Sequence, residues 1–305
     1  MLWRRFRVKD FERDNFPQIY RSADDASQSG QRWYVTWFAI NLVLLLLGAF
    51  VGSLVFTGFQ AKQTVQVLAA IFFFVALGTT IVLGTFRWER VWYSGRAVAE
   101  SAKSLTWKFV CGADPFPLEL DSKEAVARFT SALQELLNEN KHLAPVLSTQ
   151  DTGGDQVTEF MTGTRGSATG VRRDVYLSQR VNEQQAWYSN ESGKNRRRRN
   201  VWFALLILFQ SIAGIAAILL AIFPLFPWRA PAVFSTLASA AVAWGQLKRY
   251  QELAQAYALA AQELSLNAAR GAYVTTDEEL ARFVNDAETA ISREHSMWVA
   301  RREAK

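Results

Sequence analysis

The sequence predicts an all-α membrane protein with two tandem transmembrane helical hairpins, giving four spans, and with long helices that extend into a cytoplasmic helical region. The prediction rests on four apolar stretches that contain no Asp, Glu, Lys or Arg. A bilayer core requires about 20 apolar residues in a helix. A single basic residue separates the two members of each pair, so the hairpin loops are short. The stretches are Trp33–Ala61, Gln63–Phe86, Asn200–Trp228 and Ala230–Leu247.

The fourth stretch is the least hydrophobic, because much of it is Ala and Ser. At about 1.5 Å per residue it crosses only a thin bilayer. Its pairing with a strongly apolar stretch favours a span that faces other helices of a bundle. A buried helix of a soluble protein is the alternative.

The distribution of positive charge predicts the topology. Basic residues crowd the flanks outside the hairpins, whereas each hairpin tip carries one, Lys62 or Arg229. The positive-inside rule therefore predicts that both termini and the central region are cytoplasmic. A run next to the third stretch is interpreted as a topology anchor that contacts anionic lipid headgroups. Nucleic-acid binding is disfavoured there, because no aromatic residues interleave with the run. The run consists of Arg196, Arg197, Arg198 and Arg199.

The two halves of the chain follow one plan, which predicts an internal duplication. Trp-Phe-Ala recurs at 37–39 and 202–204, and Ala-Arg-Phe recurs at 127–129 and 281–283. The first module covers 1–147, with spans at about 33–59 and 64–86 and cytoplasmic helices at about 87–110 and 122–140. The second covers 171–305, with spans at about 201–226 and 230–247 and cytoplasmic helices at about 248–270 and 277–300. Residues 148–170, rich in Gly, Thr and Ser, are interpreted as a linker.

A heptad seam follows each hairpin, with apolar residues stepping alternately by three and four. Apart from Gly95 inside the first seam, no helix breaker is present, so each seam is expected to continue the second helix of its hairpin into the cytoplasm. Pairing within one chain and pairing between subunits both remain open. The seam residues are Trp88, Val91, Val98 and Leu105 in the first half and Leu247, Tyr250, Tyr257 and Leu264 in the second.

Small and hydroxyl-bearing residues recur at helix-packing spacing within the spans. They predict either close packing inside the bundle or a face around a pore with neutral walls and a hydrophobic gate. No Asp, Glu or His lies in any stretch, which disfavours a cation-coupled transporter. The residues of this predicted face are Gly48, Gly52, Thr79, Thr80, Ser235, Thr236 and Ser239.

The sequence offers little reactive chemistry. Its two histidines lie in different halves, and Cys111 is its one cysteine, so neither a Cys/His metal site nor a disulfide within the chain is predicted. Neither a Gly-x-Ser-x-Gly nor a His-Glu-x-x-His motif is present. We therefore predict no enzyme activity, no catalytic residue and no cofactor.

Three groups of residues resemble a known family. They are Tyr20–Asp24 before the first hairpin, Trp92–Ser101 with Leu105–Trp107 and Pro115-Phe116 after it, and Tyr176–Arg180 with Gln184 and Trp187-Tyr188 before the second hairpin. They are similar to the SLATT proteins, two-transmembrane effector domains that associate with SMODS nucleotidyltransferases and SLOG sensors in bacterial conflict systems. Both halves share the resemblance, so the chain resembles two SLATT modules in tandem.

The resemblance implies a multi-pass protein of the bacterial inner membrane that acts as an effector in an anti-phage or conflict system. On this basis we predict a homo-oligomer in the lipid bilayer that opens as a gated pore. A nucleotide-signal sensor or a partner defence protein would trigger it. Two alternatives remain open. One is a membrane scaffold or anchor that binds and regulates a partner defence protein through its cytoplasmic helices, and the other is a constitutive small-solute channel.

Overall fold

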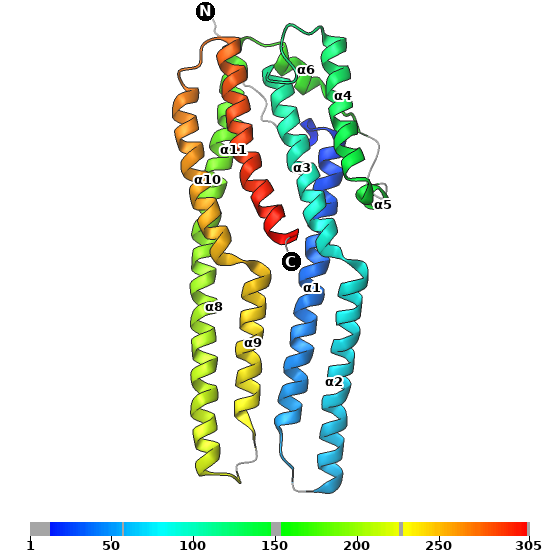
Figure 1. Ribbon diagram of the computed structural model, residues 1–305, viewed down its shortest axis with the longest axis vertical. Helices are drawn as coiled ribbons and strands as arrows, with labels where there is room; N and C mark the ends of the chain where they lie inside the picture. Colours follow the sequence, from blue (N-terminus) through cyan, green and yellow to red (C-terminus); the bar gives the residue numbers. More distant parts are fainter. Residues whose placement is uncertain (1–12, 57, 148–153, 226–227, 304–305) are drawn as a thin grey trace, which may run out of the picture. The chain divides into compact units, whose positions relative to one another are not determined.

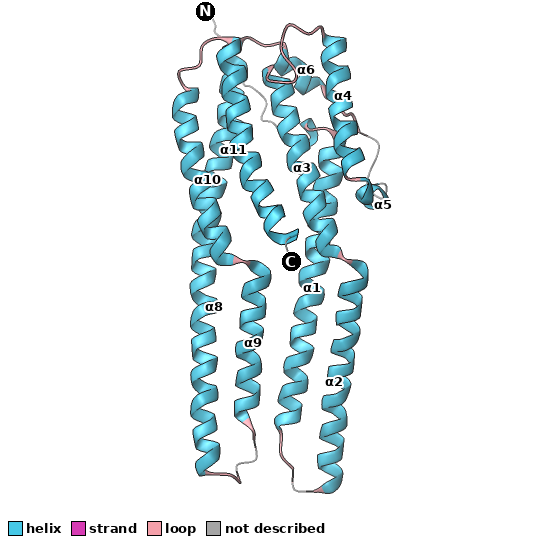
Figure 2. Cartoon of the chain, viewed as in Figure 1, coloured by secondary structure: helices cyan, strands magenta, loops and turns pink. Residues whose placement is uncertain are grey.

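The computed structural model describes residues 13–56, 58–147, 154–225 and 228–303, with side chains described through residue 292. Its regular secondary structure consists of helices (Figure 2), which confirms the all-α class. Among the described residues, the β-type pairing is limited to one antiparallel bridge between Leu54 and Trp228.

The chain divides into two compact units. The apolar unit contains Arg32–Trp88 and Ser192–Gln255, and the polar unit contains the preceding residues through Gln31, Glu89–Glu191 and the residues from Ala256. Helices α1 (Gln18–Ser53) and α8 (Glu183–Ile222) each contribute residues to both units.

The apolar unit consists of two helical hairpins (Figure 1). In the first, α1 is followed by α2 (Phe59–Phe86), and in the second, α8 is followed by α9 (Ala230–Lys248). Large apolar side chains cover the outer surface of this unit, among them Phe74, Phe203 and Ile218. Such a surface is compatible with a hydrocarbon environment.

Three helices are long and apolar enough to cross a membrane. They lie within Gln18–Ser53, Phe59–Cys111 and Thr169–Ile222. Helix α9 is not one of the three, because its Ala, Ser and Gln residues lower its hydropathy. Length and composition therefore support three of the four expected spans.

Each hairpin ends at an arginine in the left-handed backbone region. Arg87 (φ 46°) separates α2 from α3 (Trp88–Cys111), and Arg249 (φ 50°) separates α9 from α10 (Tyr250–Gly271). They are the only non-glycine residues with positive φ in the part of the chain that the structure describes. The helices were expected to run on without a break, but each is interrupted here, although neither Gly nor Pro marks the place.

A residue with a side chain pays about 1–2 kcal/mol to adopt the left-handed conformation. Contacts of the neighbouring residues offset this cost at both breaks. The Trp88 ring stacks on Phe86 at 5.0 Å and on Trp37 at 6.1 Å between ring centroids. At the second break, Arg249 pairs with Glu252 at 2.9 Å, and the Trp244 indole lies 3.3 Å from the Tyr250 hydroxyl.

In the polar unit, short helices pack around α3. Helix α4 (Ser122–Glu139) begins where Asp121 accepts a hydrogen bond from the Glu124 amide. The segment 148–170, expected to be a linker, contains α6 (Glu159–Arg165). Helix α7 (Thr169–Tyr176), the π-helical segment η3 (Leu177–Asn182) and α11 (Asp277–Glu303) complete the larger elements. The smaller elements are η1 (Arg13–Asn15), η2 (Lys141–Leu143) and α5 (Ala144–Leu147).

Candidate functional site

The two glycines of the predicted face, Gly48 and Gly52, lie at the α1–α2 interface. A Cβ atom at Gly48 would meet the Phe73 ring at 2.8 Å, and one at Gly52 would meet the Ala69 Cβ at 3.6 Å. Because Gly48 has no side chain, the ring of α2 can approach the backbone of α1. These two members of the predicted face therefore take part in packing within the hairpin.

Asn41 joins the same two helices by polar contacts. Its amide Nδ2 lies 2.7 Å from the Thr79 Oγ1, 2.9 Å from the Thr80 Oγ1 and 2.9 Å from the Ala76 carbonyl oxygen. Both threonines also donate to the Ala76 carbonyl. The structure thus brings Thr79 and Thr80 together with Asn41, to which the sequence assigned no role.

The second hairpin presents small and polar residues outward. Ser235 and Ser239 are exposed, and the hydroxyls of Thr236 and Ser239 donate to carbonyls one turn earlier in α9. The exposed residues of α9 step by three and four, so they form one face of the helix. We call this face the α9 stripe, and it consists of Ala232, Ser235, Ser239, Val242 and Gln246.

The two hairpins meet at Ser53, which is buried at the end of α1. The Trp228 indole donates to the Ser53 hydroxyl at 2.8 Å, and the Arg229 amide donates to the Ser53 carbonyl at 3.0 Å. The Phe50 ring packs against Trp228 at 6.4 Å between centroids. A backbone bridge and a side-chain contact therefore fix the start of α9 against α1.

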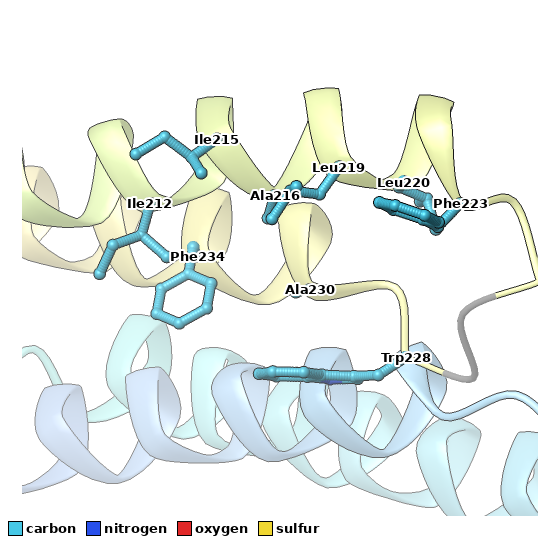
Figure 3. Close-up of a pocket in the computed structure, with 9 residues that line it drawn as sticks. All are labelled: Ile212, Ile215, Ala216, Leu219, Leu220, Phe223, Trp228, Ala230 and Phe234. Atoms are coloured by element: carbon cyan, nitrogen blue, oxygen red, sulfur yellow. The ribbon is translucent and has the colours of Figure 1, made fainter.

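An apolar groove of about 550 Å³ lies between α8 and α9 (Figure 3). Helix α8 lines it from Ile212 to Leu220, and Phe223, just after the helix, continues this side. Ala230 and Phe234 of α9 and the flat face of Trp228 line the opposite side (Figure 3). The lining carries almost no polar surface.

The remaining predicted residues fall into two sets. Arg196, Arg197 and Arg198 are exposed, and Arg199 donates to the Asn200 side chain at 2.8 Å. Of the seam residues, Val98, Tyr257 and Leu264 are buried within the chain. The other seam residues are partly exposed: Trp88, Val91, Leu105, Leu247 and Tyr250.

Two family models match the chain, one after the other. "SMODS and SLOG-associating 2TM effector domain 3" matches residues 17–173, just over half of the 305 residues. "SMODS and SLOG-associating 2TM effector domain 1" matches residues 176–298. The chain belongs to the SLATT family. Its two SLATT domains stand in tandem, which confirms the resemblance seen in the sequence. No curated protein and no solved structure matches significantly.

Each SLATT domain contains one hairpin, α1–α2 in the first and α8–α9 in the second. SLATT effector domains are associated with SMODS and SLOG conflict systems and are proposed membrane effectors rather than catalytic enzymes. Among the residues that the structure describes, no group of three His, Cys, Asp or Glu side chains could hold a metal ion.

The second SLATT domain contains a buried ion pair. The Arg180 guanidinium of η3 donates twice to the Glu288 carboxylate of α11, at 2.9 Å each, and the Tyr176 hydroxyl donates to the same carboxylate at 2.9 Å. Arg180 is 1% exposed and Glu288 is 0% exposed. Burial opposes the charge of Arg180, but the Glu288 carboxylate outweighs burial and raises the pKa of the guanidinium. The contacts therefore hold α11 against η3 by charge.

In the first SLATT domain, aromatic packing holds the corresponding helix α4. Phe129 of α4 packs against Phe109 at 4.9 Å and against Phe116 at 5.6 Å between ring centroids. All three rings are buried. The position that corresponds to Glu288, counted from the repeated Ala-Arg-Phe, is Gln134, which is exposed.

A charged contact in the polar unit also joins the two SLATT domains. The buried Arg172 donates to the Asp277 carboxylate at 2.6 Å and to the Cys111 carbonyl at 3.0 Å. The Thr169 hydroxyl also donates to Asp277. The hydrogen bond from Thr169 and the charge of Arg172 lower the pKa of Asp277. The segment that follows the expected linker thus ties the start of α11 to α3.

Proposed function

We propose that the chain is an effector of a bacterial anti-phage or conflict system that oligomerises into a gated pore in the inner membrane. The membership of both domains in a family of two-transmembrane effector domains supports the effector role. The observation that carries the pore is the α9 stripe, an exposed, uncharged and partly polar face of α9.

The polar groups of the α9 stripe need hydrogen-bond partners in the membrane. A lipid tail offers no hydrogen-bond partner to Gln246 or to the serine hydroxyls, whereas water or another protein surface does. We therefore take α9 as the fourth span and turn the α9 stripe toward a central lumen. One copy supplies one such face, so a lumen requires several copies.

The composition of the stripe defines the behaviour of the pore. Ala232, Ser235, Ser239 and Gln246 carry no charge, so the lumen selects weakly among ions. Val242 supplies an apolar ring at which the closed pore loses its water. The polar unit and both termini lie in the cytoplasm in this account, because the basic run Arg196–Arg199 belongs on that side. A nucleotide-signal sensor or a partner defence protein acts there as the trigger.

A specific observation favours a second function, a membrane scaffold that binds a partner through α10. Leu259 and Leu266 of α10 and Tyr273, just after its end, are 58%, 65% and 85% exposed and are spaced by seven residues. A partner helix could cover such a row. Leu266→Asp should abolish partner capture and leave ion flux unchanged if the chain is a scaffold as well as a pore.

The proposed function is tested by reconstitution. Native mass spectrometry of the purified chain should give a closed oligomer of three or more copies, and liposomes containing it should leak ions when its genomic partners are present. Ser239→Leu should lower the leak at least tenfold. The matched variant Ala217→Leu, on an exposed part of α8, should leave it unchanged. A monomer that does not leak, together with normal growth and membrane potential on strong expression with the partners, would contradict the pore.

A further inference from the structure

The groove between α8 and α9 is a gap that the second hairpin leaves unfilled. Its α8 side consists of residues that recur along one face of the helix, among them Ile212, Ala216 and Leu219. Phe223, just after the helix, continues this side. The opposite side is sparse, because the first turn of α9 offers Ala230 and the next large side chain is Phe234. In the first hairpin, by contrast, the α1–α2 gap is closed where Phe73 meets Gly48.

Water is a poor occupant of this groove. A water molecule needs two to four polar partners, and apolar cavities remain dry. An empty groove is also unfavourable, because its lining loses dispersion contacts on one side. Its volume, about 550 Å³, is more than three times that of an apolar cavity of about 150 Å³ that binds benzene. The lining therefore calls for an apolar occupant of considerable size.

The length of the groove indicates what that occupant is. From Ile212 to the end of α8 at Ile222 the helix rises by about 15 Å, at about 1.5 Å per residue. Half of a bilayer core measures about 15 Å. The groove is thus as long as the hydrocarbon layer of one leaflet and matches an extended acyl chain.

The end of the groove carries groups suited to a lipid headgroup. Trp228 precedes α9 and lines the groove on the side opposite α8 (Figure 3). Its indole N–H donates to the Ser53 hydroxyl. Tryptophan at the end of a span marks the interface of the bilayer. Arg229 follows, exposed, and is the basic residue of this hairpin tip. A guanidinium at this level complements a phosphate.

We propose that the groove between α8 and α9 is a phospholipid site, with an acyl chain along the side that runs from Ile212 of α8 to Phe223 and the headgroup phosphate at Arg229. The site rests on that part of the proposed function that places α8 and α9 in the bilayer, and it does not depend on ion conduction. A bound lipid also explains how the second hairpin remains open without a void.

Two neighbouring alanines of α8 provide the test. Ala216 lines the groove, whereas Ala217 is exposed and does not line it. Wild-type chain, Ala216→Trp and Ala217→Trp are purified from membranes in mild detergent and examined by native mass spectrometry. Wild type and Ala217→Trp should each retain about one phospholipid per chain, and Ala216→Trp should lose at least four-fifths of it. Equal retention in all three, or no retained phospholipid in the wild type, would overturn the proposal.

A second variant tests the site independently, in case Ala216→Trp misfolds. Arg229→Gln changes only an exposed side chain, because the bond to Ser53 comes from the Arg229 backbone amide. It should retain at most half as much phospholipid as the wild type, and unchanged retention would overturn the headgroup assignment. If a second copy fills the groove instead, Ala216→Trp will lower the oligomer mass without changing lipid content, which also overturns the proposal.

Alkaline extraction of the same membranes separates the failure of this site from failure of the proposed function. A chain that alkali releases from the membrane contradicts both. A chain that stays in the membrane and leaks ions, but retains no phospholipid, contradicts only the lipid site.

Discussion

The first hairpin is closed by contacts between its own helices, whereas the second is left open. Asn41 lies within hydrogen-bonding distance of three acceptors on α2, and Gly48 admits the Phe73 ring. Between α8 and α9 the structure instead has an apolar groove of about 550 Å³, and α9 turns Ser235 and Ser239 outward. The two halves of the duplicated chain therefore contain hairpins that pack differently.

The two hairpins differ in whether their small and polar residues contact each other or remain available to other molecules. A closed hairpin has used its small and polar residues on itself, so little remains for other molecules. An open hairpin leaves both a groove and a polar face for lipid, for further copies of the chain or for water. We infer that the first SLATT domain supports the membrane structure and that the second carries the proposed pore wall and lipid site.

The two SLATT domains also differ in their polar parts, where the buried ion pair of the second domain should give the largest change in stability. Glu288→Gln leaves the buried Arg180 without its carboxylate, so the free energy of unfolding should fall by about 3–5 kcal/mol. Gln134→Glu, at the corresponding exposed position of the first domain, should change it by less than about 0.5 kcal/mol. Urea unfolding in detergent followed by circular dichroism measures both. A loss below about 1 kcal/mol in Glu288→Gln would show that aromatic packing, as in α4, also dominates around α11.

Gly48→Leu tests whether the first hairpin is closed by packing. Its side chain would displace the Phe73 ring and should lower the free energy of unfolding by about 1–3 kcal/mol. Gly214→Leu is the matched variant in α8, where a Cβ would meet nothing within 4 Å. It should be neutral in the same urea titration. Equal losses in the two variants would break the distinction between a closed and an open hairpin.

The polar contacts of the first hairpin should contribute less. Asn41→Leu removes the hydrogen bonds to α2 and should lower the free energy of unfolding by about 1 kcal/mol, since such bonds within membranes are individually weak. Gln210→Leu in α8 removes an exposed amide and should cause no loss. Thermal unfolding monitored by tryptophan fluorescence compares the two. If Asn41→Leu is as stable as the wild type, the hydrogen bonds do not stabilise the first hairpin, and its closure rests on the packing at Gly48.

The smallest effect concerns what the hairpins share, the left-handed arginines. Gly adopts positive φ without the steric cost that Ala bears, so Arg87→Gly should be more stable than Arg87→Ala by up to about 1 kcal/mol. Both variants lose the same charge, so the difference reports on the backbone. The pair at Arg249 should behave alike. If the Ala variants are the more stable, the helices run on unbroken, as the sequence predicted.

The order of the hairpins and helices along the chain could be predicted from the sequence, whereas the contact partners of individual side chains could not. The uncharged apolar stretches predict the two hairpins, and the segments around Trp92 and Tyr176 indicate the family. The Gly48-x-x-x-Gly52 spacing predicts a packing face, but nothing in it reveals that Phe73 fills that face. The partners Arg180 and Glu288 are 108 residues apart, and no local pattern links charges over such a distance.

The breaks at Arg87 and Arg249 escaped prediction for a related reason. Gly and Pro announce a turn by their own backbone preferences, whereas an arginine in the left-handed region is held there by its neighbours. At Arg87 those neighbours include Trp88 and Trp37, which stack across two helices. Tertiary packing overrides local preference at such positions.

Chemical access to Ser239 reports whether the α9 stripe lines a pore. Native Cys111 is buried, and burial raises the pKa of its thiol, so a water-soluble thiol reagent should spare the wild type. In conducting liposomes with the genomic partners, the reagent should block most of the flux through Ser239→Cys. Ile218→Cys, exposed on α8, should remain unaffected. Unchanged flux through Ser239→Cys, or a block through Ile218→Cys alone, would contradict the account.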